Sequence, residues 1–235
     1  MPSSTPSCFD QSFSPPHSEA ELLCRAEGIA GYTLAELALR TDTPVPRDLR
    51  HAKGWTGKLV EKLLGASAAS RSEPDFSLIG VELKTLPVDA DGRPTESTYV
   101  CVAPLLDHCG ATWEASCVYR KLKRVLWYPV RSSDGLGVGN RRLGFPLLWS
   151  PSPQEERTLR TDWEEIMEAI ALGQVEGLTA YHGSSLQVRP KAANARARRL
   201  GIGGSGATIQ TLPRGFYLRR GFTEAILQRH FVLPR

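Results

Sequence analysis

The sequence predicts an α/β protein, because stretches typical of strands and of helices alternate along its 235 residues. Residues 81–88 alternate in polarity and carry β-branched side chains, as strands do. Residues 154–172 place Trp163, Ile166 and Ile170 at helical spacing with acidic residues opposite, as amphipathic helices do. The hydrophobic fraction of 41% is ordinary for a globular protein, and the length suits one domain or two closely packed lobes.

The composition narrows the class of protein. The net charge of +4 and the pI ≈ 8.9 are only mildly basic, so a nucleic-acid surface has to come from local clustering of Lys and Arg. The five cysteines are odd in number and form no C-x-x-C pair, which favours reduced thiols in the cytoplasm and argues against zinc. The five histidines show no ligand spacing. No apolar run approaches membrane-spanning length, so we expect no membrane association.

The first 18 residues differ from the rest of the chain. They are rich in Ser and Pro, show no hydrophobic periodicity and lack the basic and apolar segments of a signal peptide. We therefore expect residues 1–18 to be a flexible N-terminal tail and residues 19–235 to form a single domain.

Three helices are expected after this tail, over residues 19–27, 34–40 and 55–64. Ser18 and Thr33 are the expected N-caps of the first two, with Glu21 at the capping-box position. The third helix ends at Gly65.

The strand over residues 81–88 carries an unusual pair of charges. Glu82 and Lys84 are two residues apart and therefore project from the same face of the strand. Asp75 lies seven residues earlier, which is roughly 23 Å along an extended chain and too far for the two carboxylates to share an ion. Gly80 permits a bend or bulge that brings Asp75 back towards Glu82.

Two carboxylates and one lysine at a strand end suit metal-dependent hydrolysis of a phosphodiester. Carboxylate oxygens hold Mg²⁺, and a lysine beside the metal can orient or deprotonate a water. The alternative is a solvated strand with a Glu–Lys pair and a turn aspartate, and the spacing by itself does not separate the two.

Beyond this strand, residues 97–105 are expected to return as a hairpin partner beside it. The basic run 119–124 leads into a buried strand over residues 125–130, and residues 141–150 form a further strand. In the last third, we expect strands over residues 184–189, 209–212 and 215–220, a flexible loop over 201–206 and a helix over 223–231.

Several motifs together carry a family resemblance. Pro74-Asp75 followed by Glu82-x-Lys84 resembles the active-site pattern of the PD-(D/E)xK nuclease superfamily, which shares the core of type II restriction endonucleases. Residues 78–89 resemble, more narrowly, the MutH family of DNA mismatch-repair endonucleases. The resemblance continues, in the same order along the chain, over residues 31–34, 53–55, 101–105, 121–127, 189–194 and 212–217.

The resemblance implies a restriction-endonuclease-like mixed sheet flanked by helices, in two lobes around a DNA cleft. It implies that Asp75 and Glu82 bind the metal and that Lys84 orients or activates water. Lys121 matches a lysine of the family's active site that faces phosphate, although a basic run before a strand is more often a solvated turn. Glu61 matches a helix glutamate of the active-site region, although a helix glutamate off the apolar stripe is ordinarily solvated.

The resemblance also assigns residues that contact DNA: Lys53, Tyr99, Arg189, Lys191 and Tyr217. Arg189 can present two donors to guanine, which is the commonest specific contact in the major groove. Tyr217 matches the residue implicated in sensing adenine methylation, whereas strand geometry alone allows it to face the core with Phe216 outward. Tyr99 can likewise face either the core or DNA, and Lys53 alone is an ordinary surface lysine.

The function implied is Mg²⁺-dependent nicking of the unmethylated strand at hemimethylated GATC sites, by a monomer in the cytoplasm that the ATPase MutL activates. Mn²⁺ or Ca²⁺ can occupy the same site. One alternative is a GATC restriction endonuclease that cuts both strands, but such relatives tend to carry an extra domain or to pair their subunits. The other is a DNA-binding module without catalysis, against which the intact Asp75, Glu82 and Lys84 argue.

Overall fold

The computed structural model describes residues 13–50, 52–68, 72–106, 110–132, 135–179, 182–191 and 196–231. Within these ranges the chain forms two compact units, the first from residues 13–95 and 124–149 and the second from residues 96–123 and 150–231. No helix in the described part of the chain has the length and hydrophobicity needed to cross a lipid bilayer.

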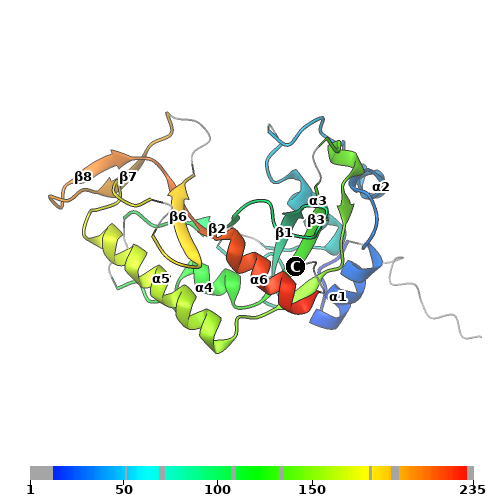
Figure 1. Cartoon of the computed structure of the whole chain (residues 1–235), viewed down its shortest axis with the longest axis horizontal. Coiled ribbons are helices and arrows are strands. Elements are labelled where there is room, and N and C mark those ends of the chain that lie inside the picture. Colours follow the sequence, from blue (N-terminus) through cyan, green and yellow to red (C-terminus); the bar gives the residue numbers. More distant parts are fainter. Residues whose placement is uncertain are drawn as a thin grey trace, which may run out of the picture. The chain divides into compact units, whose positions relative to one another are not determined.

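The first unit contains a mixed four-stranded sheet and three helices (Figure 1). Strand β1 (Glu82–Val88) pairs in parallel with β3 (Val125–Arg131), and β3 pairs antiparallel with β4 (Arg142–Leu143) and β5 (Leu147–Trp149). The helices are α1 (Glu19–Gly28), α2 (Leu34–Arg40) and α3 (Trp55–Leu64), and a 3-10 turn, η1, covers Val138–Asn140. Apolar residues of all three helices share one buried cluster with β1 and β3, which confirms the predicted mixed sheet flanked by helices.

The pairing of β1 corrects one prediction. Strand β2 (Thr98–Val102) does not form a hairpin with β1 but belongs to the second unit, where it pairs with β9 (Arg214–Leu218). The neighbour of β1 is instead β3, whose apolar residues Val125 to Tyr128 are all 0% exposed. A parallel neighbour requires a long crossover, and the whole segment between β1 and β3 supplies it.

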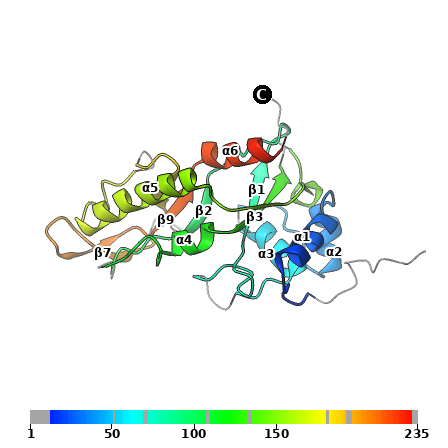
Figure 2. The ribbon, with the colours of Figure 1, turned by 90° about the horizontal axis from the view of Figure 1, so that it is seen from below.

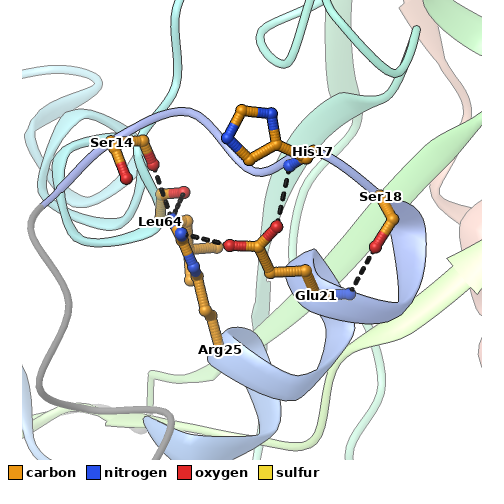
Figure 3. Close-up of polar contacts among 6 residues, drawn as sticks. All are labelled: Ser14, His17, Ser18, Glu21, Arg25 and Leu64. Carbon is orange, nitrogen blue, oxygen red and sulfur yellow. Dashed lines mark hydrogen bonds and ion pairs between the residues drawn. The ribbon is translucent and has the colours of Figure 1, made fainter.

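Two of the predicted helix caps are confirmed. Ser18 accepts a hydrogen bond from the Glu21 amide at 3.1 Å, and Thr33 forms a full capping box with Glu36. Glu21 does not complete a capping box with Ser18, because its carboxylate accepts from the His17 amide at 2.8 Å and pairs with Arg25 (Figure 3).

Part of the predicted tail is held against the first unit. The Arg25 guanidinium donates to the Ser14 carbonyl at 2.6 Å and to the Leu64 carbonyl at 3.4 Å, which ties the segment before α1 to the end of α3 (Figure 3). Gly65, with φ of +77°, lies so close that an added Cβ would be 2.2 Å from the Ser14 carbonyl oxygen. Residues 1–12 lie outside the described part of the chain.

The second unit is built on a three-stranded antiparallel sheet in the order β2-β9-β6, where β6 spans Leu186–Pro190. Helix α5 (Pro153–Ala171) runs along this unit, which also contains α4 (Cys117–Leu122) and α6 (Arg220–His230) (Figure 2). Trp163, Ile166 and Ile170 are buried, which confirms α5 as an amphipathic packing helix.

The predicted loop over residues 201–206 is wrong for its first two residues and confirmed as a turn for residues 204–206. Residues 201 and 202 belong to β7 (Arg199–Ile202), which pairs antiparallel with β8 (Thr208–Thr211), so only the connecting residues form a turn. Gly173, just after α5, permits close contact with this hairpin, because a Cβ added to Gly173 would be 2.2 Å from the Gly203 carbonyl oxygen.

A buried carboxylate connects α5 to the start of β6. Asp162 is 4% exposed and accepts hydrogen bonds from the backbone amides of Ser184, Ser185 and Leu186 at 2.7–2.8 Å. The Ser184 hydroxyl also donates to it at 3.2 Å. These bonds satisfy the charge of Asp162 and fix where β6 begins.

Replacing Asp162 should therefore destabilise the second unit. We expect Asp162→Ala to lower the free energy of unfolding by about 2–4 kcal/mol, because it leaves buried amides without an acceptor. Urea denaturation measures the change, and Glu165→Ala on the exposed face of α5 is the matched control. An Asp162→Ala midpoint equal to that of the control would contradict this role.

Candidate active site

A tight turn brings Asp75 opposite Glu82. Phe76 and Val81 form an isolated antiparallel bridge, with the Phe76 amide donating to the Val81 carbonyl at 2.9 Å. Gly80 has φ of +68°, a left-handed conformation that glycine adopts without strain. The predicted bend at Gly80 is therefore confirmed, and it closes the separation between the two carboxylates that an extended chain would leave.

The three residues of the predicted nuclease pattern come together at the start of β1. The Asp75 carboxylate accepts a hydrogen bond from the Leu83 amide at 2.9 Å. The Lys84 ammonium forms an ion pair with Glu82, so the two share one face of the strand as predicted. Glu82 is 1% exposed and Lys84 is half-buried, so their charges interact in surroundings of low dielectric constant.

Glu61 on α3 faces this cluster. Burial raises the pKa of the Glu61 carboxyl, and the negative charges of Asp75 and Glu82 raise it further, against the opposing effect of Lys84 and Lys58. A Cβ added to Gly57 would lie 3.7 Å from Glu61 Oε1 and 3.8 Å from Thr85 Oγ1, which places α3 directly against β1. The structure thus brings together four predicted site residues from α3, the turn and β1.

The donor set suits Mg²⁺. Asp75 and Glu82 offer hard carboxylate oxygens, and Mg²⁺ commonly takes one or two carboxylates while its other ligands are water and phosphate. Burial is the main cause of the raised pKa of Glu61, and the negative charges of Asp75 and Glu82 add a part that a divalent cation would offset. Within the described ranges, no group of three or more His, Cys, Asp or Glu side chains could hold a metal ion.

Four predicted DNA-contacting residues form a second group, on the β2-β9-β6 sheet. The Tyr99 and Tyr217 rings meet edge to face, with centroids 5.3 Å apart. The Lys191 ammonium lies 2.8 Å from the centroid of the Tyr99 ring, and the Arg189 guanidinium lies 5.9 Å from that of Tyr217. Two aromatic rings and two cations therefore share one face, which we call the aromatic–cation cluster.

Strand register explains this cluster. Tyr217 on β9 is opposite Tyr99 on β2, and Arg189 on β6 is opposite Gly215 on β9. A Cβ on Gly215 would be 3.0 Å from Tyr99 Cε2 and 3.3 Å from Lys191 Cδ, so glycine leaves room for both side chains.

The alternative orientation of Tyr217 is wrong. Phe216 is 1% exposed and packs in the core, whereas Tyr217 is half-buried on the other face of β9. Burial raises the pKa of the Tyr217 hydroxyl, with Arg189 opposing and Glu96 adding to the shift. The tyrosine therefore stays protonated at neutral pH and can donate a hydrogen bond.

The two remaining lysines lie on separate units. Lys53 is exposed in the first unit, next to Gly54, whose φ of +81° begins α3. Lys121 lies on α4 of the second unit and is 6% exposed. Its role beside the carboxylates stays a prediction, because they belong to the first unit.

Comparison with known proteins shows to which family this chain belongs. Residues 64–162 match the family model described as DNA mismatch repair enzyme MutH. The chain is 57% identical over 220 residues to the DNA mismatch repair protein MutH of Klebsiella pneumoniae strain 342, covering 94% of this chain and 95% of that protein. It is 58% identical over 219 residues to that of Salmonella typhi, covering 93% and 95%. The chain belongs to the MutH family.

The similarity to MutH proteins extends over both units. The family model begins in α3 and ends in α5, so it includes the Asp75–Glu82 turn, β1, β3 and α4. Relatives that match 93–94% of the chain also take in β6 and β9, which carry Arg189 and Tyr217 of the aromatic–cation cluster.

One polar contact of the cluster was not predicted. Arg189 Nη1 donates to the Ser97 hydroxyl at 2.8 Å. Ser97 lies two residues before Tyr99 and so falls on the same strand face, which is the signal that could have identified it.

The raised pKa of Glu61 predicts a pH effect on the metal-free protein. The folded protein holds this proton more tightly than the unfolded chain, whose pKa is near 4.5, so stability falls as the pH rises from about 4.5 through the folded pKa. We expect Glu61→Gln to remove this loss and to be more stable than wild type at pH 7 in EDTA, with no advantage below pH 4.

Thermal unfolding from pH 4 to pH 8 measures this difference. Glu165→Gln on the exposed face of α5 is the control and should follow wild type throughout. A constant offset of Glu61→Gln at every pH would rule out titration of Glu61 as its source.

Proposed function

We propose that this protein is a Mg²⁺-dependent endonuclease that nicks the unmethylated strand at hemimethylated GATC sites in methyl-directed mismatch repair. The observation that carries the proposal is the turn that sets Asp75 opposite Glu82, with Lys84 paired to Glu82 on the same strand face. Membership of the MutH family supports the setting in mismatch repair.

Each residue of the site has a distinct role in hydrolysis. Mg²⁺ held by Asp75 and Glu82 would polarise the scissile phosphate and acidify a water, and Mn²⁺ or Ca²⁺ can bind the same oxygens. Lys84 supplies a positive charge that orients this water and stabilises negative charge on the phosphate. The Leu83 amide holds the Asp75 carboxylate in place, and Glu61 adds a further carboxyl at the edge of the site.

The aromatic–cation cluster is the proposed surface for reading DNA. Arg189 is exposed and can present its planar fork to the O6 and N7 atoms of guanine. Tyr217 carries a rigid ring and a protonated hydroxyl, which can hydrogen-bond to the adenine amino group or collide with a methyl group on it. Lys191, Lys53 and Lys121 supply positive charge for bases or phosphates.

We further propose that the protein is a monomer in the cytoplasm and that ATP-bound MutL accelerates it. Slow nicking by the protein alone would protect hemimethylated sites where there is no mismatch. Acceleration by MutL requires that MutL favour the catalytically competent conformation over others.

Nicking of a supercoiled plasmid separates this function from its rivals. With Mg²⁺ and a hemimethylated GATC site, the proposed enzyme should produce open circles, faster with MutL and ATP. Linear product and no effect of MutL would favour a restriction endonuclease that cuts both strands. Binding without cleavage in any metal would favour a DNA-binding module.

Substitutions at the three nuclease residues test catalysis. Asp75→Asn keeps an acceptor for the Leu83 amide but removes the charge, and it should abolish nicking while DNA binding persists. Glu82→Gln should do the same, and Lys84→Ala should slow turnover by about 100-fold. Rates of open-circle formation measure these effects.

Asp91→Ala, in the exposed turn after β1, is the control for the carboxylate variants and should nick normally. Circular dichroism confirms folding of each variant. An Asp75→Asn enzyme that nicks at the wild-type rate would remove Asp75 from the metal site.

Tyr217→Phe tests methylation sensing. This change keeps the ring against Tyr99 and removes the hydroxyl, so the variant should still nick unmethylated GATC. We expect the ratio of rates on unmethylated and hemimethylated duplexes to change by about threefold to tenfold, more than the overall rate does. Initial rates on unmethylated, hemimethylated and fully methylated duplexes provide the comparison.

Tyr119→Phe is the matched control, because that ring also packs edge to face, against Trp113 in the same unit. If Tyr217→Phe slows all three duplexes by one common factor, Tyr217 supports structure or catalysis and does not sense the methyl group.

A further inference from the structure

The hydrogen bond between Arg189 and Ser97 crosses the middle strand of the second unit. Ser97 directly precedes β2, Arg189 lies on β6, and β9 runs between these two strands. The long arginine side chain therefore reaches over β9, past Tyr217, to meet the Ser97 hydroxyl at 2.8 Å. The bond joins the two outer strands of the sheet on the face that carries the aromatic–cation cluster.

The two partners of this bond differ in how firmly the fold holds them. Arg189 is exposed near the end of β6, and its side chain has several rotatable bonds. Ser97 is half-buried and is followed by Thr98 and Val100, both buried in β2. Ser97 is therefore the fixed partner, and its hydroxyl restricts the orientations open to the guanidinium.

The geometry leaves the arginine able to read a base. A guanidinium has five N–H donors, and Ser97 engages only one nitrogen, Nη1. The remaining donors still offer a planar pair to guanine. The Tyr217 ring, 5.9 Å from the guanidinium carbon, restricts it on a second side.

We propose that Ser97 is a positioning residue that holds Arg189 ready for base readout. This inference rests on the proposed function, because it assumes that Arg189 reads the recognition sequence. A guanidinium held in its reading orientation loses less conformational entropy when DNA binds, so the bond strengthens specific binding more than non-specific binding. Ser97 itself need not touch DNA.

Three variants test the proposal by binding in Ca²⁺, measured by fluorescence anisotropy on a GATC duplex and on a duplex with the site scrambled. The specificity ratio is the dissociation constant for the scrambled duplex divided by that for the GATC duplex. We expect Ser97→Ala to reduce this ratio by about twofold to tenfold, mainly through weaker binding to GATC. Ser97→Thr keeps the hydroxyl and should restore the ratio. Thr208→Ala removes an exposed strand hydroxyl from β8 and is the matched control.

A double-mutant cycle with Arg189→Ala separates positioning from a merely structural role. If Ser97 acts through Arg189, then Ser97→Ala should have no further effect on the ratio once Arg189 is replaced. An equal effect in both backgrounds would overturn the proposal, as would an unchanged ratio for Ser97→Ala or equal weakening on both duplexes.

A measurement without DNA distinguishes failure of this inference from failure of the proposed function. Nitrogen-15 relaxation of the Arg189 Nε–H group should show greater mobility in Ser97→Ala than in wild type and Ser97→Thr. Equal mobility in all three would overturn the positioning role even where wild type prefers GATC. If the wild-type protein shows no preference for GATC, the proposed specificity is wrong. The role of Ser97 in base readout by Arg189 would then be wrong as well.

Discussion

The placing of two carboxylates opposite each other across one tight turn is the constraint on which the candidate active site depends. Like charges repel, so a chain that places Asp75 opposite Glu82 needs something to hold them there. The backbone does this through the Phe76–Val81 bridge and the left-handed Gly80, and the Leu83 amide and the Lys84 ammonium supply compensating positive charge. Glu61 lies beside these residues, and burial raises the pKa of its carboxyl, with the negative charges of Asp75 and Glu82 adding to the rise.

Charge is distributed unevenly along the chain, and this explains why a mildly basic protein can hold a nucleic-acid surface. Residues 189–223 contain eight Lys or Arg and no Asp or Glu, so the remaining chain, with 21 basic and 25 acidic residues, is net negative. This basic segment supplies β7, β8, β9 and the end of β6. This concentration of positive charge therefore lies in the unit that carries the aromatic–cation cluster, while Asp75 and Glu82 lie in the other.

Local patterns predicted the elements well, and non-local pairing explains most of the errors. The three N-terminal helices, the strand after Gly80 and the amphipathic α5 follow from capping residues and hydrophobic period, and all are present. Local patterns could not predict which strand pairs with β1, because strand pairing depends on how distant parts of the chain come together in the fold. The β7–β8 hairpin was missed because its run of glycines resembles a flexible loop, although Gly201 and Gly203 pack against Thr211 and Ile209 within the hairpin.

The candidate site likewise combines residues that local patterns predicted with a residue that only the fold reveals. Asp75, Glu82 and Lys84 were predictable, because glycine before a charged strand implies a bend and a two-residue spacing implies a shared face. Ser97 was not predicted, because its partner lies 92 residues away on a strand whose neighbour is known only from the fold. The family resemblance, and not the spacing, selected the outward orientation of Tyr217 that Phe216 in the core now explains.

One of the places where the chain passes between the two units lies beside Glu82. The chain leaves the second unit after Lys123, and the next residue, Arg124, accepts a hydrogen bond from the Glu82 amide at 3.0 Å through its carbonyl. The Arg124 side chain forms an ion pair with Glu19 at the start of α1. The backbone position of Glu82 is thus fixed by the residue at which the chain re-enters the first unit, and Lys121 is only three residues before it. From Arg124 the chain continues directly into β3, which pairs with β1 in parallel from Glu82 opposite Val125 to Val88 opposite Arg131, so the same connection begins the pairing that holds all of β1.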